Sequence, residues 1–373
     1  MLKIASKFTK KSVLIIVGLV ILLSIETIAA INLFLPKSNI IPLNFPVKNV
    51  SSPAPTTIPK PNIAKMPELS YSIPIPYHVF QSFNNCGPAT LAMALNYWGA
   101  DTNQQTLGLE MRPYQNAQGI NDDKSVFASE FITFSNKYGY EALVRPNGTI
   151  EILKKFIAND IPVVVRTWLH PNEDIGHFRI VRGFDDTNKT ILQNDSYEGK
   201  DLQYSYDTFL QMWQPFNYGY IVVYPKEKQE LVSEILGAEI DEKTAWENSI
   251  TRALAEGPTP YPLFNQSVAN YYLGNYQESI SKFEQAEKAL PSRMLWYQLE
   301  PILSYQKIGN NDRVIFLINT IISAGNGGFA ELYQIRGEIH ESLGKNSLAK
   351  ADFEKAYFYN SNLISAREEA EKL

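Results

Sequence analysis

A chain of 373 residues with a net charge of −5 has room for two or three domains, and its apolar content is that of a globular protein. Its lysines and arginines form no basic stripe, which argues against binding to nucleic acid, because that function needs a phosphate-neutralising surface. Its single cysteine, Cys86, excludes a disulfide framework within the chain.

The N-terminal segment predicts a membrane anchor. Residues 13–35 are strongly apolar, and as a helix rising ~1.5 Å per residue they can cross a bilayer core of ~30 Å. Four positive charges precede this stretch: Lys3, Lys7, Lys10 and Lys11. The positive-inside rule therefore predicts a cytoplasmic basic N-terminus over 1–11, a transmembrane signal-anchor helix over 12–35 and an extracytoplasmic remainder.

Two other interpretations of this segment stay open. Glu26 is costly at membrane depth, and the uninterrupted apolar run 13–23 has the length of a signal-peptide core. The segment could therefore be a cleaved signal, which would make the protein a secreted one, or a buried core helix. The anchor and the signal both place most of the chain outside the cytoplasm.

Proline dominates the next stretch. Residues 36–76 contain ten prolines, each of which fixes φ and removes a backbone donor. The stretch is predicted to be an extended linker of polyproline character that holds the next domain away from the lipid.

Residues 77–225 are predicted to form an α+β domain. Helices are expected over 88–98 and 125–137, and Gly99 ends the first of them. Four later runs are rich in β-branched and aromatic residues and predict strands: 163–168, 178–184, 190–193 and 218–224. Helices first and a sheet afterwards indicate an α+β arrangement, followed by a linker over 226–244.

The last third, residues 245–373, is helical and repetitive. Leucine or isoleucine followed by glycine recurs at a spacing of 35 residues, with the glycines Gly274, Gly309 and Gly344. Helical hairpins with a glycine turn at this period resemble tetratricopeptide repeats. The alternative is an irregular helical bundle. The resemblance implies a protein partner bound through the repeats.

Cys86 lies where a cysteine nucleophile is expected. It begins a predicted helix, where unpaired N–H groups and the positive end of the dipole favour a thiolate. Gln81, five residues earlier, could supply an amide donor to an oxyanion beside the Cys86 backbone N–H. The alternative for Cys86 is a small, inert, buried side chain.

A histidine on a predicted hairpin can serve this thiol. His177 opens a strand, and a turn over 185–188 leads into the next one. The register then pairs His177 with Ser196 and places Asp195 beside it, where a carboxylate would fix the imidazole tautomer. Asn194 could play that orienting role instead. Other candidate bases are His78 and His170.

These segments carry a resemblance. Gln81 to Gly99, Gly176-His177 and Asn194-Asp195 resemble the peptidase C39-like family of papain-fold cysteine peptidases. The resemblance implies a papain-like domain. It assigns Cys86 as nucleophile, His177 as base and acid, Asp195 as orienter and Gln81 as oxyanion-hole donor. Ser196 departs from the proline that often follows the aspartate in that family.

The resulting hypothesis is a membrane-anchored cysteine peptidase that hydrolyses a peptide or isopeptide bond, with a peptide or protein substrate. The alternatives are acyl transfer to an amine, and a non-catalytic scaffold that binds peptides or proteins. No Cys pair or His-Glu-x-x-His motif indicates a metal, and no cofactor is expected. The absence of a Gly-x-Ser-x-Gly motif argues against a serine hydrolase.

Overall fold

The computed structural model describes residues 64–65, 67–116 and 126–373. All of them belong to one compact unit that begins at Pro61. The predicted cytoplasmic N-terminus, the transmembrane helix over 12–35 and most of the proline-rich linker lie outside the described residues. Among those described, no helix combines the length and apolarity needed to cross a membrane.

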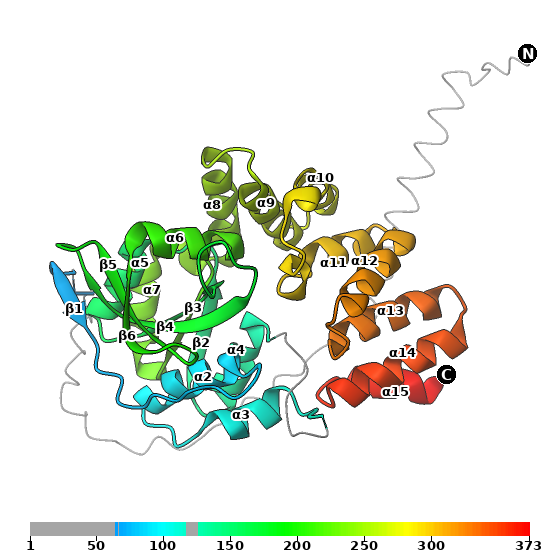
Figure 1. Ribbon diagram of the computed structural model, residues 1–373, viewed down its shortest axis with the longest axis horizontal. Helices are drawn as coiled ribbons and strands as arrows, with labels where there is room; N and C mark the ends of the chain where they lie inside the picture. Colours follow the sequence, from blue (N-terminus) through cyan, green and yellow to red (C-terminus); the bar gives the residue numbers. More distant parts are fainter. Residues whose placement is uncertain (1–63, 66, 117–125) are drawn as a thin grey trace, which may run out of the picture. The chain divides into compact units, whose positions relative to one another are not determined.

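An antiparallel sheet organises the first part of the described chain (Figure 1). Its strands in spatial order are β2-β7-β3-β4-β5-β6, and β1 pairs with β4. Their bounds are β1 Ser70–Ser72, β2 Glu141–Arg145, β3 Val163–Trp168, β4 Gly176–Asp185, β5 Thr190–Asp195, β6 Gly199–Ser205 and β7 Tyr220–Tyr224. Every pairing in this sheet is antiparallel.

Helices cover both faces of the sheet (Figure 1). The helices of this region are α2 Cys86–Tyr97, α3 Gln104–Met111, α4 Ala128–Lys137, α5 Ile150–Ala158, α6 Tyr206–Trp213 and α7 Gln229–Leu236. Val164 packs with α2 and α4, whereas Val163 and Val165 pack with α5 and α7. Because side chains alternate along a strand, the valine run of β3 can fill two cores at once.

The strand predictions are confirmed within two residues at each end. The expected order of helices before the sheet is wrong, because β2 precedes α5 and α6 follows β6. The segment 226–244 was expected to be a linker, but it contains α7. This helix buries Leu231, Val232 and Ile235 in the core that it shares with α5. The amphipathic pattern of α7 is short, and its apolar face is explained only by the core against which it packs.

The C-terminal part is made of helices. They are α8 Glu242–Ala255, α9 Pro260–Tyr272, α10 Tyr276–Ala286, α11 Glu300–Lys307, α12 Asn311–Ser323, α13 Ala330–Ser342, α14 Asn346–Tyr359 and α15 Ile364–Lys372. Gly274, Gly309 and Gly344 join α9 to α10, α11 to α12 and α13 to α14 with φ of 78°, 76° and 68°. Glycine adopts this left-handed conformation without a steric penalty, so the 35-residue period corresponds to three successive helical hairpins.

The sheet region (residues 70–236) and the helical region (residues 242–372) share a hydrophobic core. Trp168, Met212 and Phe216 of the sheet region belong to the same buried cluster as Phe264 and Tyr297 of the helical region. The two regions are therefore not independent modules joined by a tether.

A buried ion pair also joins the two regions. The Arg112 side chain is 0% exposed, and it lies 2.5 Å from Glu130 of α4 and 2.8 Å from Glu331 of α13. Burial raises the pKa of Glu130 to about 7, although the charge of Arg112 opposes the shift.

Replacing Arg112 by Met should lower the free energy of unfolding by about 3 kcal/mol at pH 8, because two partly buried carboxylates lose their cation. The loss should be smaller at pH 5, where Glu130, whose pKa burial already raises to about 7, can protonate in the folded state. Urea unfolding at the two pH values measures the difference. Lys137→Met is the matched control, since it removes an exposed cation from α4 that pairs with Glu110. It should change stability by less than about 1 kcal/mol, and equal losses in both variants would contradict the prediction.

Candidate active site

The segment before Cys86 is held by a side chain from α3. Gln104 is 2% exposed, and its Oε1 accepts a hydrogen bond from the Ser82 backbone N–H at 2.9 Å. Its Nε2 donates to the Phe80 carbonyl at 2.6 Å, and its own carbonyl accepts from Asn85 Nδ2 at 3.1 Å. These bonds fix the chain that leads into Cys86. A glutamine in a polar helix start gives no signal for this role.

Cys86 is the first residue of α2 and is partly exposed. The positive end of the helix therefore lies at its backbone. Gly87 follows it because a Cβ there would lie 2.9 Å from Cγ1 of Val126. This glycine permits α2 to pack closely against Val126.

His177 lies on β4 and is 3% exposed. Its Nε2 donates to Oδ1 of Asp195 at 2.9 Å. The imidazole also lies beside the Cys86 thiol, and the two groups shift each other's pKa. Because Nε2 is engaged by Asp195, Nδ1 is the nitrogen available to the thiol. The structure thus brings together Cys86, His177 and Asp195 from a helix and two neighbouring strands.

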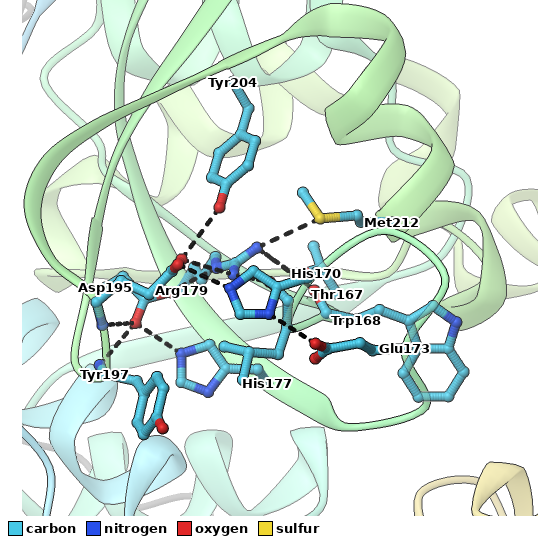
Figure 2. Close-up of polar contacts among 12 residues, drawn as sticks. Thr167, Trp168, His170, Glu173, His177, Arg179, Asp195, Tyr197, Tyr204 and Met212 are labelled. Atoms are coloured by element: carbon cyan, nitrogen blue, oxygen red, sulfur yellow. Dashed lines mark hydrogen bonds and ion pairs between the residues drawn. The ribbon is translucent and has the colours of Figure 1, made fainter.

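Asp195 is fully buried and receives four hydrogen bonds (Figure 2). Besides His177, its Oδ1 accepts from the backbone N–H of Tyr197 at 2.6 Å and of Glu198 at 3.0 Å. Its Oδ2 accepts from Nε of Arg179 at 2.6 Å. The carboxylate therefore has one defined orientation, with one oxygen toward His177 and the other toward Arg179.

The predicted register between β4 and β5 is wrong by a small shift. Asp195 is opposite Arg179, so His177 reaches it diagonally from two residues along the same face of β4. The expected pairing of His177 with Ser196 assumed that Phe184 faces Lys189. In the structure Asp185 pairs with Thr190, and a bulge between Val181 and Gly183 moves the register again.

Arg179 is the residue of the site that sequence reasoning missed. It is fully buried, and its guanidinium also donates to the hydroxyl of Thr167 at 3.1 Å and to the carbonyl of Leu169. These contacts bind Arg179 to β3 and hold it against Asp195 (Figure 2). Its position two residues after His177 on a strand was the available signal, because such residues share a face.

The pKa values of the three groups are displaced in a consistent way. Burial opposes ionisation of Cys86, but the hydrogen bond and charge of His177, the Phe178 backbone and Arg166 together lower the pKa of the thiol. Burial also disfavours the charged imidazole, yet bonds to Asp195 and Cys86 raise the pKa of His177 to about 9. The pKa of Asp195 lies well below its usual range, because His177 and Arg179 outweigh its burial. A thiolate–imidazolium pair is therefore favoured near neutral pH.

Gln81 lies beside the residue that follows Asp195. Its backbone N–H donates to the Ser196 carbonyl at 2.7 Å, and its Oε1 accepts from the Ser196 hydroxyl at 2.8 Å. With the amide oxygen engaged, Nε2 remains the group that can donate. Ser196, where proline was expected from the resemblance, thus fixes the amide of Gln81. The oxyanion-hole role of Gln81 stays a prediction.

The alternative residues have other partners. His78 Nε2 lies 2.9 Å from the Asp195 carbonyl, and His170 contacts Glu198 at 2.8 Å. Asn194 accepts from the Asp201 backbone N–H at 3.1 Å, and as the neighbour of Asp195 in β5 it faces away from the imidazole. His177 is the histidine placed at Cys86, and Asp195 is its acceptor.

Residues 67–116 and 126–373 contain no group of three or more His, Cys, Asp or Glu side chains arranged to hold a metal ion. The chemistry that this site can perform is nucleophilic attack by sulfur, with proton transfer through one histidine.

Comparison with known proteins agrees with the resemblance seen in the sequence. Residues 72–221 match the model of the Peptidase_C39 like family. No curated protein matches the chain.

Three solved structures show similarity at low identity. A C39-like peptidase from Bacillus anthracis is 16% identical over 43% of this chain and 99% of its own, with a TM-score of 0.35. The first TPR of Spaghetti is 20% identical over 33% of this chain and 90% of its own, with a TM-score of 0.27. MamA from Desulfovibrio magneticus RS-1 is 17% identical over 35% and 82%, with a TM-score of 0.29.

At these identities and TM-scores, no single structure assigns a function to the chain. The family match covers the segment that contains Cys86, His177 and Asp195. Residues 72–221 therefore form a domain of the Peptidase_C39 like family, followed by a helical region that resembles tetratricopeptide repeats.

Proposed function

We propose that this protein is a membrane-anchored, extracytoplasmic cysteine peptidase-like hydrolase with a papain-like arrangement of its site. It cleaves a peptide or isopeptide bond through a thiolate on Cys86. The observation that carries the proposal is the position of the His177 imidazole, which lowers the pKa of the Cys86 thiol and hydrogen-bonds the buried Asp195.

The reaction has two halves. The Cys86 sulfur attacks the carbonyl carbon of the scissile bond, and a C–S bond forms while the carbonyl oxygen becomes an oxyanion. The imidazolium of His177 then gives its proton to the leaving nitrogen as the C–N bond breaks. This releases an amine and leaves an acyl-thioester. Water next attacks the thioester, and His177 takes a proton from it. The C–S bond breaks, which releases a carboxylic acid and regenerates the Cys86 thiolate.

Stabilisation of the oxyanion is assigned to two donors. The Cys86 backbone N–H lies in the first turn of α2, where helix N–H groups have no intrahelical acceptor. The Gln81 amide is the second donor, since Ser196 engages its oxygen and leaves its nitrogen available. Asp195 does not exchange protons in this scheme, because its role is to orient and stabilise the imidazolium.

The anchor is part of the proposal and rests on the apolar stretch over 13–35 with lysines before it. The full chain should remain in the membrane fraction after alkaline carbonate extraction, whereas a chain beginning at residue 61 should not. Extracellular protease should reach the domain in intact cells. Release of the full chain by carbonate would contradict an anchor and would favour the cleaved signal.

Alkylation of Cys86 by iodoacetamide should remain fast at mildly acidic pH. The reason is that His177 lowers the pKa of the thiol, although burial acts in the opposite direction. An ordinary thiol has a pKa of ~8.5. His177→Ala should move the midpoint of the rate–pH curve upward by at least about one unit. Mass spectrometry reports a single site, because the chain has one cysteine. A midpoint near that of the urea-unfolded chain, indifferent to His177, would show that Cys86 is not activated.

Cleavage of a mixed peptide library should be lost in Cys86→Ala and reduced by ~10²-fold or more in Asp195→Asn, in which the imidazolium loses its counter-charge. Glu198→Gln is the matched control. It also removes one carboxylate beside Arg179, at 3.4 Å, but the structure gives that carboxylate no bond to His177. It should retain cleavage within about tenfold. Products that persist in Cys86→Ala would rule out the proposed nucleophile.

A further inference from the structure

We propose that a cavity between the sheet region and the helical region is a substrate subsite for an aromatic side chain. This inference rests on the proposed function, and it names the class of substrate. The cavity has a volume of about 280 Å³. Its lining comes from α4, β3, β4, β7 and the segment after α6 on one side, and from α8, α9, Tyr297 and α11 on the other.

The cavity adjoins the nucleophile through three of its lining residues. Phe178 hydrogen-bonds Cys86 through its backbone, and the charge of Arg166 acts on the same thiol. Tyr297 also interacts electrostatically with Cys86. A substrate whose carbonyl carbon lies at the Cys86 sulfur can therefore place a nearby side chain in this cavity.

Tyr297 brings the helical region into contact with residues beside Cys86 and His177. Its ring packs so closely on Gly176 that a Cβ there would lie 3.0 Å from the ring carbons. Gly176 is the residue before His177. The Tyr297 carbonyl accepts a hydrogen bond from Nη1 of Arg166 at 3.0 Å. The wall that the helical region supplies is thus held by contacts to the residues around the nucleophile.

The size and lining of the cavity favour an aromatic ring. A cavity of ~150 Å³ lined by apolar residues can hold benzene, so 280 Å³ accommodates a phenol or an indole. Ile132, Phe216 and Val268 contribute apolar surface. The Arg166 guanidinium already lies 4.3 Å from the centre of the Phe178 ring. A second ring is attracted to such a cation.

The test uses the full chain and dipeptide chloromethyl ketones, acetyl-Xaa-Gly and acetyl-Gly-Xaa, with Tyr, Phe, Ala or Lys as Xaa. The rate of Cys86 alkylation is measured at pH 9 by mass spectrometry and divided by the iodoacetamide rate. An ordinary thiol also reacts at this pH, so the ratio does not depend on activation of Cys86. In one series the tyrosine probe should react at least about tenfold faster than the alanine probe, which corresponds to about 1.4 kcal/mol.

Substitutions that fill the cavity should remove this preference without changing the iodoacetamide rate. Val268→Trp fills it from α9, and Ala128→Phe fills it from α4. Thr133→Phe is the matched control, because Thr133 is exposed on α4 and does not line the cavity.

Three results would overturn the inference. They are equal rates for tyrosine and alanine in both series, a faster rate for lysine than for tyrosine, and a tyrosine preference that survives both filling substitutions. Each of them leaves the proposed nucleophile intact, since that is decided by the dependence of the iodoacetamide rate on pH and on His177.

Discussion

The site depends on one buried carboxylate shared by two cations. Asp195 is fully buried, and burial alone would favour its neutral form. His177 on one oxygen and Arg179 on the other reverse that preference, and two backbone N–H groups add to them. A neutral Asp195 could not hold the imidazolium. The ionisation of Cys86 therefore traces back to a carboxylate that remains charged inside the protein.

The position of Arg179 explains why the sheet must have this register. Arg179 is bonded to Thr167 and Leu169, so β3, β4 and β5 all meet at its guanidinium. A shift of one residue between β4 and β5 would turn Asp195 to the opposite face of the sheet. The bulge between Val181 and Gly183 sets that register at the site. It thus acts as part of the site, although it lies away from the chemistry.

Much of this arrangement could be predicted from the sequence, because local signals agreed with the fold. The valine run of β3 and the helix start at Cys86 are such signals, and so is the glycine period of the helical region. The bulge between Val181 and Gly183 could not be predicted, because the register of β4 against β5 depends on tertiary pairing and not on the local sequence pattern. The packing of α7 was missed for the same kind of reason, since eight residues carry too short a pattern to reveal their partner.

The residues assigned to the chemistry lie in one part of the chain, and the proposed subsite also draws residues from another part. The matched segment over 72–221 contains the three residues to which we assign the chemistry: Cys86, His177 and Asp195. Tyr297 and Val268 lie outside it, in a helical region that the sequence presents as a separate module. The shared core makes that separation physically unrealistic, because a domain ending near residue 225 would expose Trp168, Met212 and Phe216 to water. The chemistry that we propose thus lies within the matched segment, and the proposed selectivity arises where the helical region covers it.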